Sequence, residues 1–286
     1  MPRSRIRPTM VGIILTLAAC VAGYAQQPGP PPVSPSGGAE LDPVVDKILT
    51  RLENREVHDL QAKVRWELRH VIEEDEDATC KSGTIFYKEE QPVAKFKVHF
   101  DTKITGNRKQ KLDEEHLFDG RWYTELQSQT KTVTRREIRH ADEKTNPYKL
   151  GEGAFPLPFG QKKADILAEF EVRRNPEEKG DPPDTDHLRL TPRPDTQTGR
   201  TYKVLDFWVA RAGEHAGLPV KVVAGKKDGT GAVNSYISIS FSDIKLNSGL
   251  SSSVFKIEAP RDYEVIEERL DPIELPPGIA PAEGSP

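Results

Sequence analysis

The histidines and cysteines of this chain form no recognised catalytic or metal-binding pattern. The seven histidines are dispersed, and no two stand at a ligand spacing such as His-Glu-x-x-His. Cys80 has no second cysteine nearby, because the other one is Cys20. The sequence also contains no nucleophile elbow, phosphate-binding loop or dinucleotide-binding fingerprint. We therefore predict a protein that is not an enzyme and that uses no metal and no cofactor.

Apolar side chains are the stronger candidates for a binding function. Residues 151–160 are largely apolar, yet three glycines and two prolines exclude regular structure there. Phe155, Leu157 and Phe159 in this stretch must reach an apolar surface, either as a lid over a hydrophobic cavity or as a fixed loop that plugs it. Aromatic residues on the inward face of strands would line the same cavity or simply fill the core. The candidates are Trp66, Phe96 and Trp208.

Two helices are expected to support these residues. Asp42-Pro43 predicts the start of the first, because aspartate is a good N-cap and proline is favoured at the first helical position. Apolar residues then follow at helical spacing up to Leu52. A second helix is predicted over residues 162–170, which include Ile166 and Phe170.

Alternating polarity predicts most of the remaining chain to be strands. Between residues 60 and 68 every second position is apolar, a period that fits a strand. Asp119-Gly120 and Asp228-Gly229 are tight-turn dipeptides, and short turns between strands imply an antiparallel sheet. Further strands are predicted at 85–87, 94–100, 131–138, 187–190, 202–209, 218–223, 233–241, 254–257 and 263–266.

A sheet of this length is expected to curl. The predicted fold class is α+β. It consists of a strongly curved antiparallel β-sheet, an unclosed half-barrel, with the helices covering its concave apolar face.

The first 25 residues have the three parts of a secretory signal peptide. Three arginines precede an apolar run from Met10 to Ala19, and Ala25 is suitably placed for cleavage. The run is much shorter than the roughly 20 residues that span a bilayer. Removing this segment deletes three arginines and no acidic residue, so the formal net charge changes from −4 to −7. An acidic chain without a basic cluster is a poor ligand for nucleic acid. We therefore predict an exported protein that does not bind nucleic acid.

Cys20 offers an alternative to simple cleavage. Leu17-Ala18-Ala19-Cys20 has the form of a lipobox, and two acyl chains on Cys20 would anchor the protein to a membrane. Residues 26–39 are rich in proline, glycine and serine, which is typical of a disordered spacer. The predicted organisation is a signal peptide at 1–25, this spacer, one β domain at 40–270 and a disordered tail at 271–286.

Three stretches resemble the outer-membrane lipoprotein carrier family, the LolA/LolB-like half-barrels. One combines Asp119-Gly120-Arg121-Trp122-Tyr123 with Lys131-Thr132-Val133-Thr134, and a second is Leu188-Arg189-Leu190-Thr191-Pro192. The third runs from Gly217-Leu218-Pro219 to Val233–Phe241 and ends at Phe255 and Ala259-Pro260. They follow the family order over residues 41–266, although this chain carries more charge at 106–116 and 173–187.

The resemblance implies a divergent carrier or receptor that works in the periplasm, or on a membrane to which Cys20 anchors it. Its ligands would be acyl chains or lipoproteins, and a membrane receptor protein is a further expected partner. The cavity residues would be Trp66, Phe96, Phe155, Leu157, Phe159 and Trp208. The alternative is an envelope sensor, regulator or scaffold that uses the same half-barrel to bind a protein partner.

Overall fold

The computed structural model describes residues 41–71, 78–90, 93–139 and 161–270. The predicted signal peptide with Cys20, the spacer, the stretch with Phe155, Leu157 and Phe159, and the tail lie outside the described residues. Within the described ranges, no helix has the length and apolar character needed to cross a bilayer.

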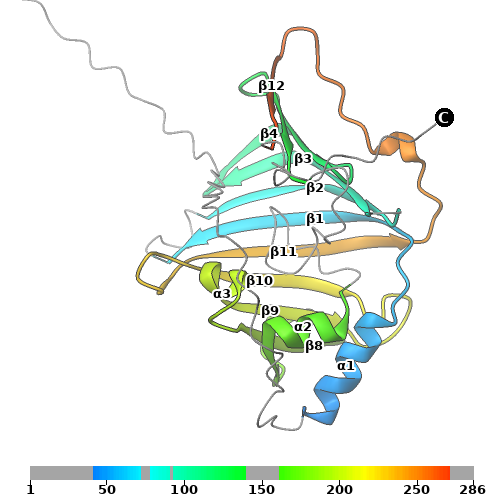
Figure 1. Ribbon diagram of the computed structural model, residues 1–286, viewed down its shortest axis with the longest axis vertical. Coiled ribbons are helices and arrows are strands. Elements are labelled where there is room, and N and C mark those ends of the chain that lie inside the picture. Colours follow the sequence, from blue (N-terminus) through cyan, green and yellow to red (C-terminus); the bar gives the residue numbers. More distant parts are fainter. Residues whose placement is uncertain (1–40, 72–77, 91–92, 140–160, 271–286) are drawn as a thin grey trace, which may run out of the picture. The chain divides into compact units, whose positions relative to one another are not determined.

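One twelve-stranded sheet forms the body of residues 41–270. Its strand order is β12-β6-β5-β4-β3-β2-β1-β11-β10-β9-β8-β7, so β1, the first strand, lies between β2 and the penultimate strand β11 near the middle of the sheet (Figure 1). The two end strands, β12 and β7, do not pair with each other, so the sheet is unclosed. This sheet and the helices that accompany it confirm the predicted α+β fold class. The strands are β1 (Asp59–His70), β2 (Thr79–Lys88), β3 (Lys95–Thr105), β4 (Arg108–Phe118), β5 (Trp122–Gln127), β6 (Thr132–Glu137), β7 (Phe170–Asn175), β8 (Thr185–Pro192), β9 (Tyr202–Ala210), β10 (Pro219–Lys227), β11 (Val233–Leu246) and β12 (Glu264–Glu268).

The first helix, α1 (Pro43–Glu53), begins where the capping signal predicts. Asp42 Oδ1 accepts a hydrogen bond from Val44 N at 2.8 Å, which satisfies one of the free N–H groups of the first turn. Arg51 near the C-terminal end holds the helix to β8 through Asp186, with 2.7 Å between Nη2 and Oδ2. The second helix, α2 (Lys163–Glu169), is joined to α1 by an ion pair between Lys163 and Asp46.

One face of the sheet, here called the apolar face, carries two hydrophobic clusters. The first cluster joins strands β1–β5 and β11 and contains no residue of any described helix. The second cluster joins α1 and α2 to strands β7–β10, and Figure 1 shows both helices over this part of the sheet. Among the described residues, helix cover is therefore confined to one end of the apolar face.

A segment that we call the strap, residues 247–263, links β11 at the middle of the sheet to β12 at its edge. Lys88 Nζ donates to Leu250 O at 3.0 Å, and Lys97 Nζ donates to Lys256 O at 2.7 Å. These bonds hold the strap across β2 and β3 and deliver β12 to the far side of β6. There β12 pairs in parallel with β6, whereas all other strand pairs are antiparallel.

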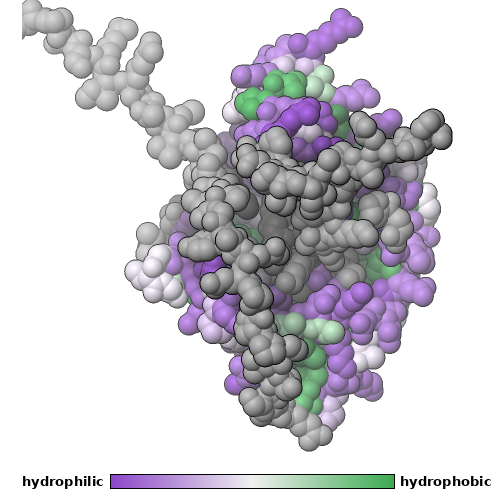
Figure 2. Space-filling model, in the orientation of Figure 1, coloured by the Kyte–Doolittle hydropathy of each residue, from purple (hydrophilic) through white to green (hydrophobic). Residues whose placement is uncertain are grey.

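All five residues of β12 are exposed. Val265 retains 54% of its accessible surface and Ile266 retains 39%. Figure 2 accordingly shows hydrophobic surface at this edge, next to hydrophilic residues.

Several elements differ from the sequence prediction. Residues 254–257 are not a strand, since a short 3-10 helix, Ser252–Val254, stands at that point of the strap. Strands β4 and β7 extend through charged segments that were not predicted as strands, because polar residues occupy both faces in much of their length. The short helix α3 (Gln197–Thr201) was also not predicted.

Asp59 fixes the beginning of the strap to the beginning of β1. Its buried carboxylate accepts hydrogen bonds from Ser248 N at 2.8 Å, from Gly249 N at 2.9 Å and from Leu250 N at 3.3 Å. Burial opposes its ionisation, but these donors together outweigh burial, so the pKa of Asp59 is lowered.

Asp59→Ala is expected to lower the free energy of unfolding by about 2 kcal/mol, because it leaves these N–H groups without an acceptor. Urea denaturation at pH 7 measures this. The exposed Asp195→Ala is the control and should change stability by less than about 0.5 kcal/mol. Since the folded pKa of Asp59 is depressed, its contribution is present above the usual carboxyl pKa and is lost as the pH falls through the lowered one. Equal losses in both variants would contradict the anchoring role of Asp59.

Candidate functional site

The first hydrophobic cluster is the main candidate for a binding surface. Strand register places its members on one face, since Val64 on β1 stands opposite Phe241 on β11 and Trp66 stands opposite Ile239. Val98 and Phe100 on β3 extend it toward β4, and both are almost completely buried. The buried members are Val57, Leu60, Ala62, Val64, Ile85, Tyr87, Val93, Phe96, Val98, Phe100, Leu112, Phe118, Tyr123, Leu218, Ile239 and Phe241.

Two of the residues that the sequence singled out lie in or against this cluster. Phe96 is buried, with its ring centroid 6.1 Å from that of Phe118. Trp66 is partly buried and packs against the cluster from β1. Trp66 is therefore a partly accessible aromatic residue beside a buried apolar cluster.

Trp208 lies on the opposite face of the sheet. On β9 it alternates with Phe207 and Val209, which belong to the second cluster, while Trp208 belongs to neither cluster. Its indole stacks on the His187 ring at 4.3 Å and donates a hydrogen bond from Nε1 to Asp181 Oδ1 at 2.7 Å. The last six residues of β9 are all buried, so the strand is covered on both faces and polarity alone did not show which face is inward.

A polar network borders the first cluster and was not predicted from the sequence. Lys81 Nζ lies 2.5 Å and 2.7 Å from the two carboxylate oxygens of Glu114. His116 Nε2 lies 2.7 Å from Glu114 Oε1, and His116 Nδ1 lies 2.8 Å from the hydroxyl of Tyr123. The His116 ring meets Phe100 edge-on, with centroids 5.8 Å apart. The network therefore continues directly from the aromatic part of the cluster.

The electrostatics of this network keep Glu114 ionised. Burial is the largest influence and raises its pKa, but the hydrogen bond from His116 and the charge of Lys81 outweigh burial and lower the pKa to about 2. Because the carboxylate only accepts, His116 Nε2–H is the donor in their contact. Burial also raises the pKa of Tyr123, which therefore stays protonated.

The same network contains a set of atoms that could hold a cation. Ligand atoms of Glu114, His116 and Glu125 lie within 4.8 Å of one another. The ammonium of Lys81 already neutralises Glu114, however, so the network is charge-balanced by side chains. The sequence does contain a signal for this network. Glu114 and His116 stand at every second position before the buried Phe118, so on a strand all three side chains point to the same face.

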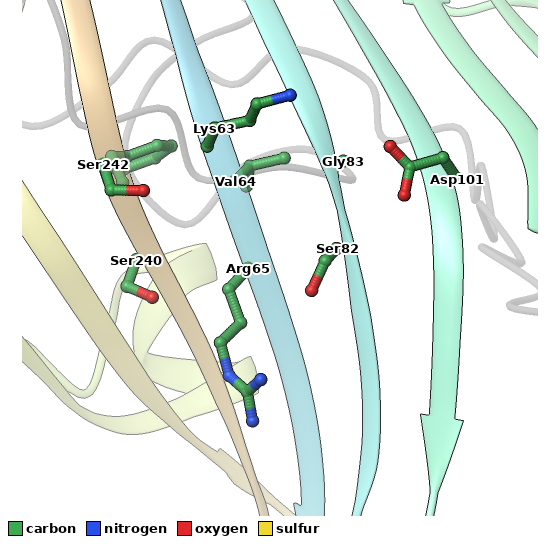
Figure 3. A pocket seen from close by; sticks show the side chains of 9 residues that line it. Lys63, Val64, Arg65, Ser82, Gly83, Asp101, Ser240 and Ser242 are labelled. Carbon is green, nitrogen blue, oxygen red and sulfur yellow. The ribbon is translucent and has the colours of Figure 1, made fainter. Parts of the chain in front are cut away.

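A depression of about 360 Å³ lies between β1, β2, β3 and β11. Most of its lining residues are polar, among them Arg65, Ser82 and Ser240 (Figure 3), which the strand register places on the face opposite the first cluster. The lining residues are Lys63, Val64, Arg65, Ser82, Gly83, Asp101, Ser240, Phe241 and Ser242. No sequence motif marks this depression, because its residues come from four strands.

No protein-family model matches the chain, and a comparison with curated protein sequences finds no match. Solved structures similar to it include an uncharacterised conserved protein from Thermus thermophilus, with 11% identity, a TM-score of 0.44 and coverage of 79% of this chain and 99% of the other. A putative outer membrane lipoprotein-sorting protein domain from Vibrio parahaemolyticus has 15% identity, a TM-score of 0.37 and coverage of 74% and 94%. A LolA superfamily protein from Nitrosomonas europaea has 12% identity, a TM-score of 0.37 and coverage of 74% and 97%.

The names of two of these solved structures thus match the family that the sequence resembles. At identities of 15% or less and TM-scores below 0.5, these similarities carry no functional weight. The function proposed below rests on this chain's own residues.

Proposed function

We propose that this protein binds acyl chains, those of lipids or of lipoproteins, at the first hydrophobic cluster, and that it acts without catalysing a reaction. It would do so after export, in the periplasm or on a membrane to which Cys20 anchors it. Phe155, Leu157 and Phe159 would contribute to the same apolar site, and a membrane receptor protein would exchange the ligand.

One observation carries this proposal, namely the difference between the two clusters. The second cluster is completed by buried residues of α1 and α2, such as Leu49 and Ile166. The first cluster is a comparable set of buried apolar side chains that no described helix completes. A surface of aliphatic and aromatic side chains suits an acyl chain, since each buried CH₂ contributes about 0.8 kcal/mol. The partly exposed Trp66 marks a margin of the cluster from which a chain can enter.

Tryptophan fluorescence can test this proposal, because the three tryptophans lie in different places. Trp66 packs against the first cluster, whereas Trp122 on β5 and Trp208 on β9 belong to neither cluster. Dibrominated stearic acid quenches only nearby indoles, and ordinary stearic acid controls for non-specific effects. We expect quenching in the wild type and in Trp122→Phe and Trp208→Phe, and loss of most of it in Trp66→Phe.

The outcome separates the two candidate functions. Quenching that persists in Trp66→Phe would place the acyl chain elsewhere. An absence of quenching in every variant would instead favour the scaffold or sensor function, in which the half-barrel binds a protein.

A further inference from the structure

Two cations on β1 each stand between hydroxyl residues of both neighbouring strands. Lys63 is directly opposite Thr84 on β2 and Ser242 on β11. Arg65, two residues along, is directly opposite Ser82 on β2 and Ser240 on β11. Directly opposite residues have Cβ atoms roughly 5 Å apart, so these side chains can reach one bound group. We call the set the hydroxyl-cation array; it consists of Lys63, Arg65, Ser82, Thr84, Ser240 and Ser242.

Five members of the array line the depression of about 360 Å³, and Figure 3 shows them around it. Val64 and Phe241 are also among the lining residues, and both belong to the first cluster. Two strand irregularities border the site. The register of β2 and β3 shifts between Ser82 and Gly83, and that of β3 and β4 shifts between Phe100 and Thr102, beside Asp101. Bulges of this kind commonly redirect side chains near binding sites.

The donors of the array remain largely available. Lys63 Nζ has one contact, to Thr84 Oγ1 at 3.3 Å. Arg65 Nη2 contacts Glu67 Oε2 at 3.2 Å, but both side chains are well exposed, at 53% and 35%, so this ion pair is weak and leaves other guanidinium donors free. Within the described part of the chain, the hydroxyls of Ser240 and Ser242 have no hydrogen-bond partner. Asp101 supplies the one carboxylate of the lining, and Oδ1 there accepts a hydrogen bond from Thr102.

We propose that the depression binds a phosphate-type oxyanion, either free or as the headgroup of a phospholipid. Two cations against one carboxylate give the lining a net positive charge in an acidic protein. A guanidinium fork, an ammonium and several hydroxyl donors form the set of groups that proteins use for tetrahedral oxyanions. The site lies on the face opposite the first cluster, so a headgroup bound here would orient the protein with that cluster away from the lipid surface.

An NMR titration of the ¹⁵N-labelled mature protein with inorganic phosphate at constant ionic strength tests the site. Co-sedimentation with vesicles of phosphatidylglycerol, compared with phosphatidylcholine, tests the headgroup source. The array variants are Lys63→Gln/Arg65→Gln and Ser240→Ala/Ser242→Ala. The matched control is Lys203→Gln/Lys226→Gln, which removes the same charge from exposed residues on β9 and β10. All substituted residues lie outside the hydrophobic clusters, so the fold should be retained.

We expect saturable binding that weakens at least about tenfold in Lys63→Gln/Arg65→Gln and about threefold in Ser240→Ala/Ser242→Ala, with no change in the control. Binding of inorganic phosphate would show that the site recognises the free anion and needs no lipid. Binding of phosphatidylglycerol vesicles alone, with the same dependence on the variants, identifies the headgroup. The proposal is overturned by a lack of saturable binding to either probe. It is also overturned if the control weakens binding equally, or if the serine substitutions have no effect.

Discussion

Gly83→Ala is expected to lower the free energy of unfolding by about 3 kcal/mol, which is the upper end of the usual cost of overpacking. Gly83 pairs with Val64 on β1 and with Phe100 on β3, where the register of β2 and β3 shifts. An added Cβ would lie 1.9 Å from His99 O and 2.8 Å from Phe100 Cα. Because these are backbone atoms, no side-chain rotation can relieve the contact, and β2 and β3 must move apart.

Gly229→Ala is the matched control for this substitution. Gly229 lies in the turn after β10, and an added Cβ there would have no atom within 4 Å. We expect its stability to change by less than about 0.5 kcal/mol. Urea denaturation of both variants measures the difference. A Gly83→Ala protein as stable as the control would show that β2 and β3 can separate at little cost, and that the close approach is not required by the fold.

Lys81→Met is expected to lower the free energy of unfolding by about 3 kcal/mol at pH 7, because it leaves the buried carboxylate of Glu114 without its cation. Glu114→Gln should cost a similar amount by leaving Lys81 without its carboxylate. In the double variant neither charge remains, so its loss should be clearly smaller than the sum of the two single losses. A double-mutant cycle in urea measures this coupling. Additive losses would show that the pair does not act as a unit.

The pH dependence gives an independent test of the same pair. The pKa of Glu114 is lowered from the usual 4.5 to about 2 in the folded protein. A depressed folded pKa means that the stabilisation is full above pH 4.5 and is lost as the pH falls toward 2. The stability difference between the wild type and Lys81→Met should therefore shrink over this range. A difference that stays constant would assign the effect of the substitution to packing rather than to charge.

Local sequence patterns determined much of the fold. The capping residues Asp42 and Pro43 placed the start of α1, since their effect acts within one helical turn. The alternation of apolar and polar residues assigned the side chains of β1 to the two faces of the sheet. This works because successive side chains of a strand point to opposite faces, whichever strands it pairs with. Phe96 and Trp66 could be assigned to the apolar face on this basis.

Only the tertiary structure decided which strands are neighbours and what the opposite face contains. Trp208 follows the alternation of β9, but both faces of that strand are covered, so hydrophobicity did not distinguish them. Lys81 and Glu114 are 33 positions apart and meet because β3 pairs with both β2 and β4. β12 reaches β6 in parallel through the strap, although the two strands are far apart in the sequence. Such contacts depend on long-range pairing, which no local periodicity encodes.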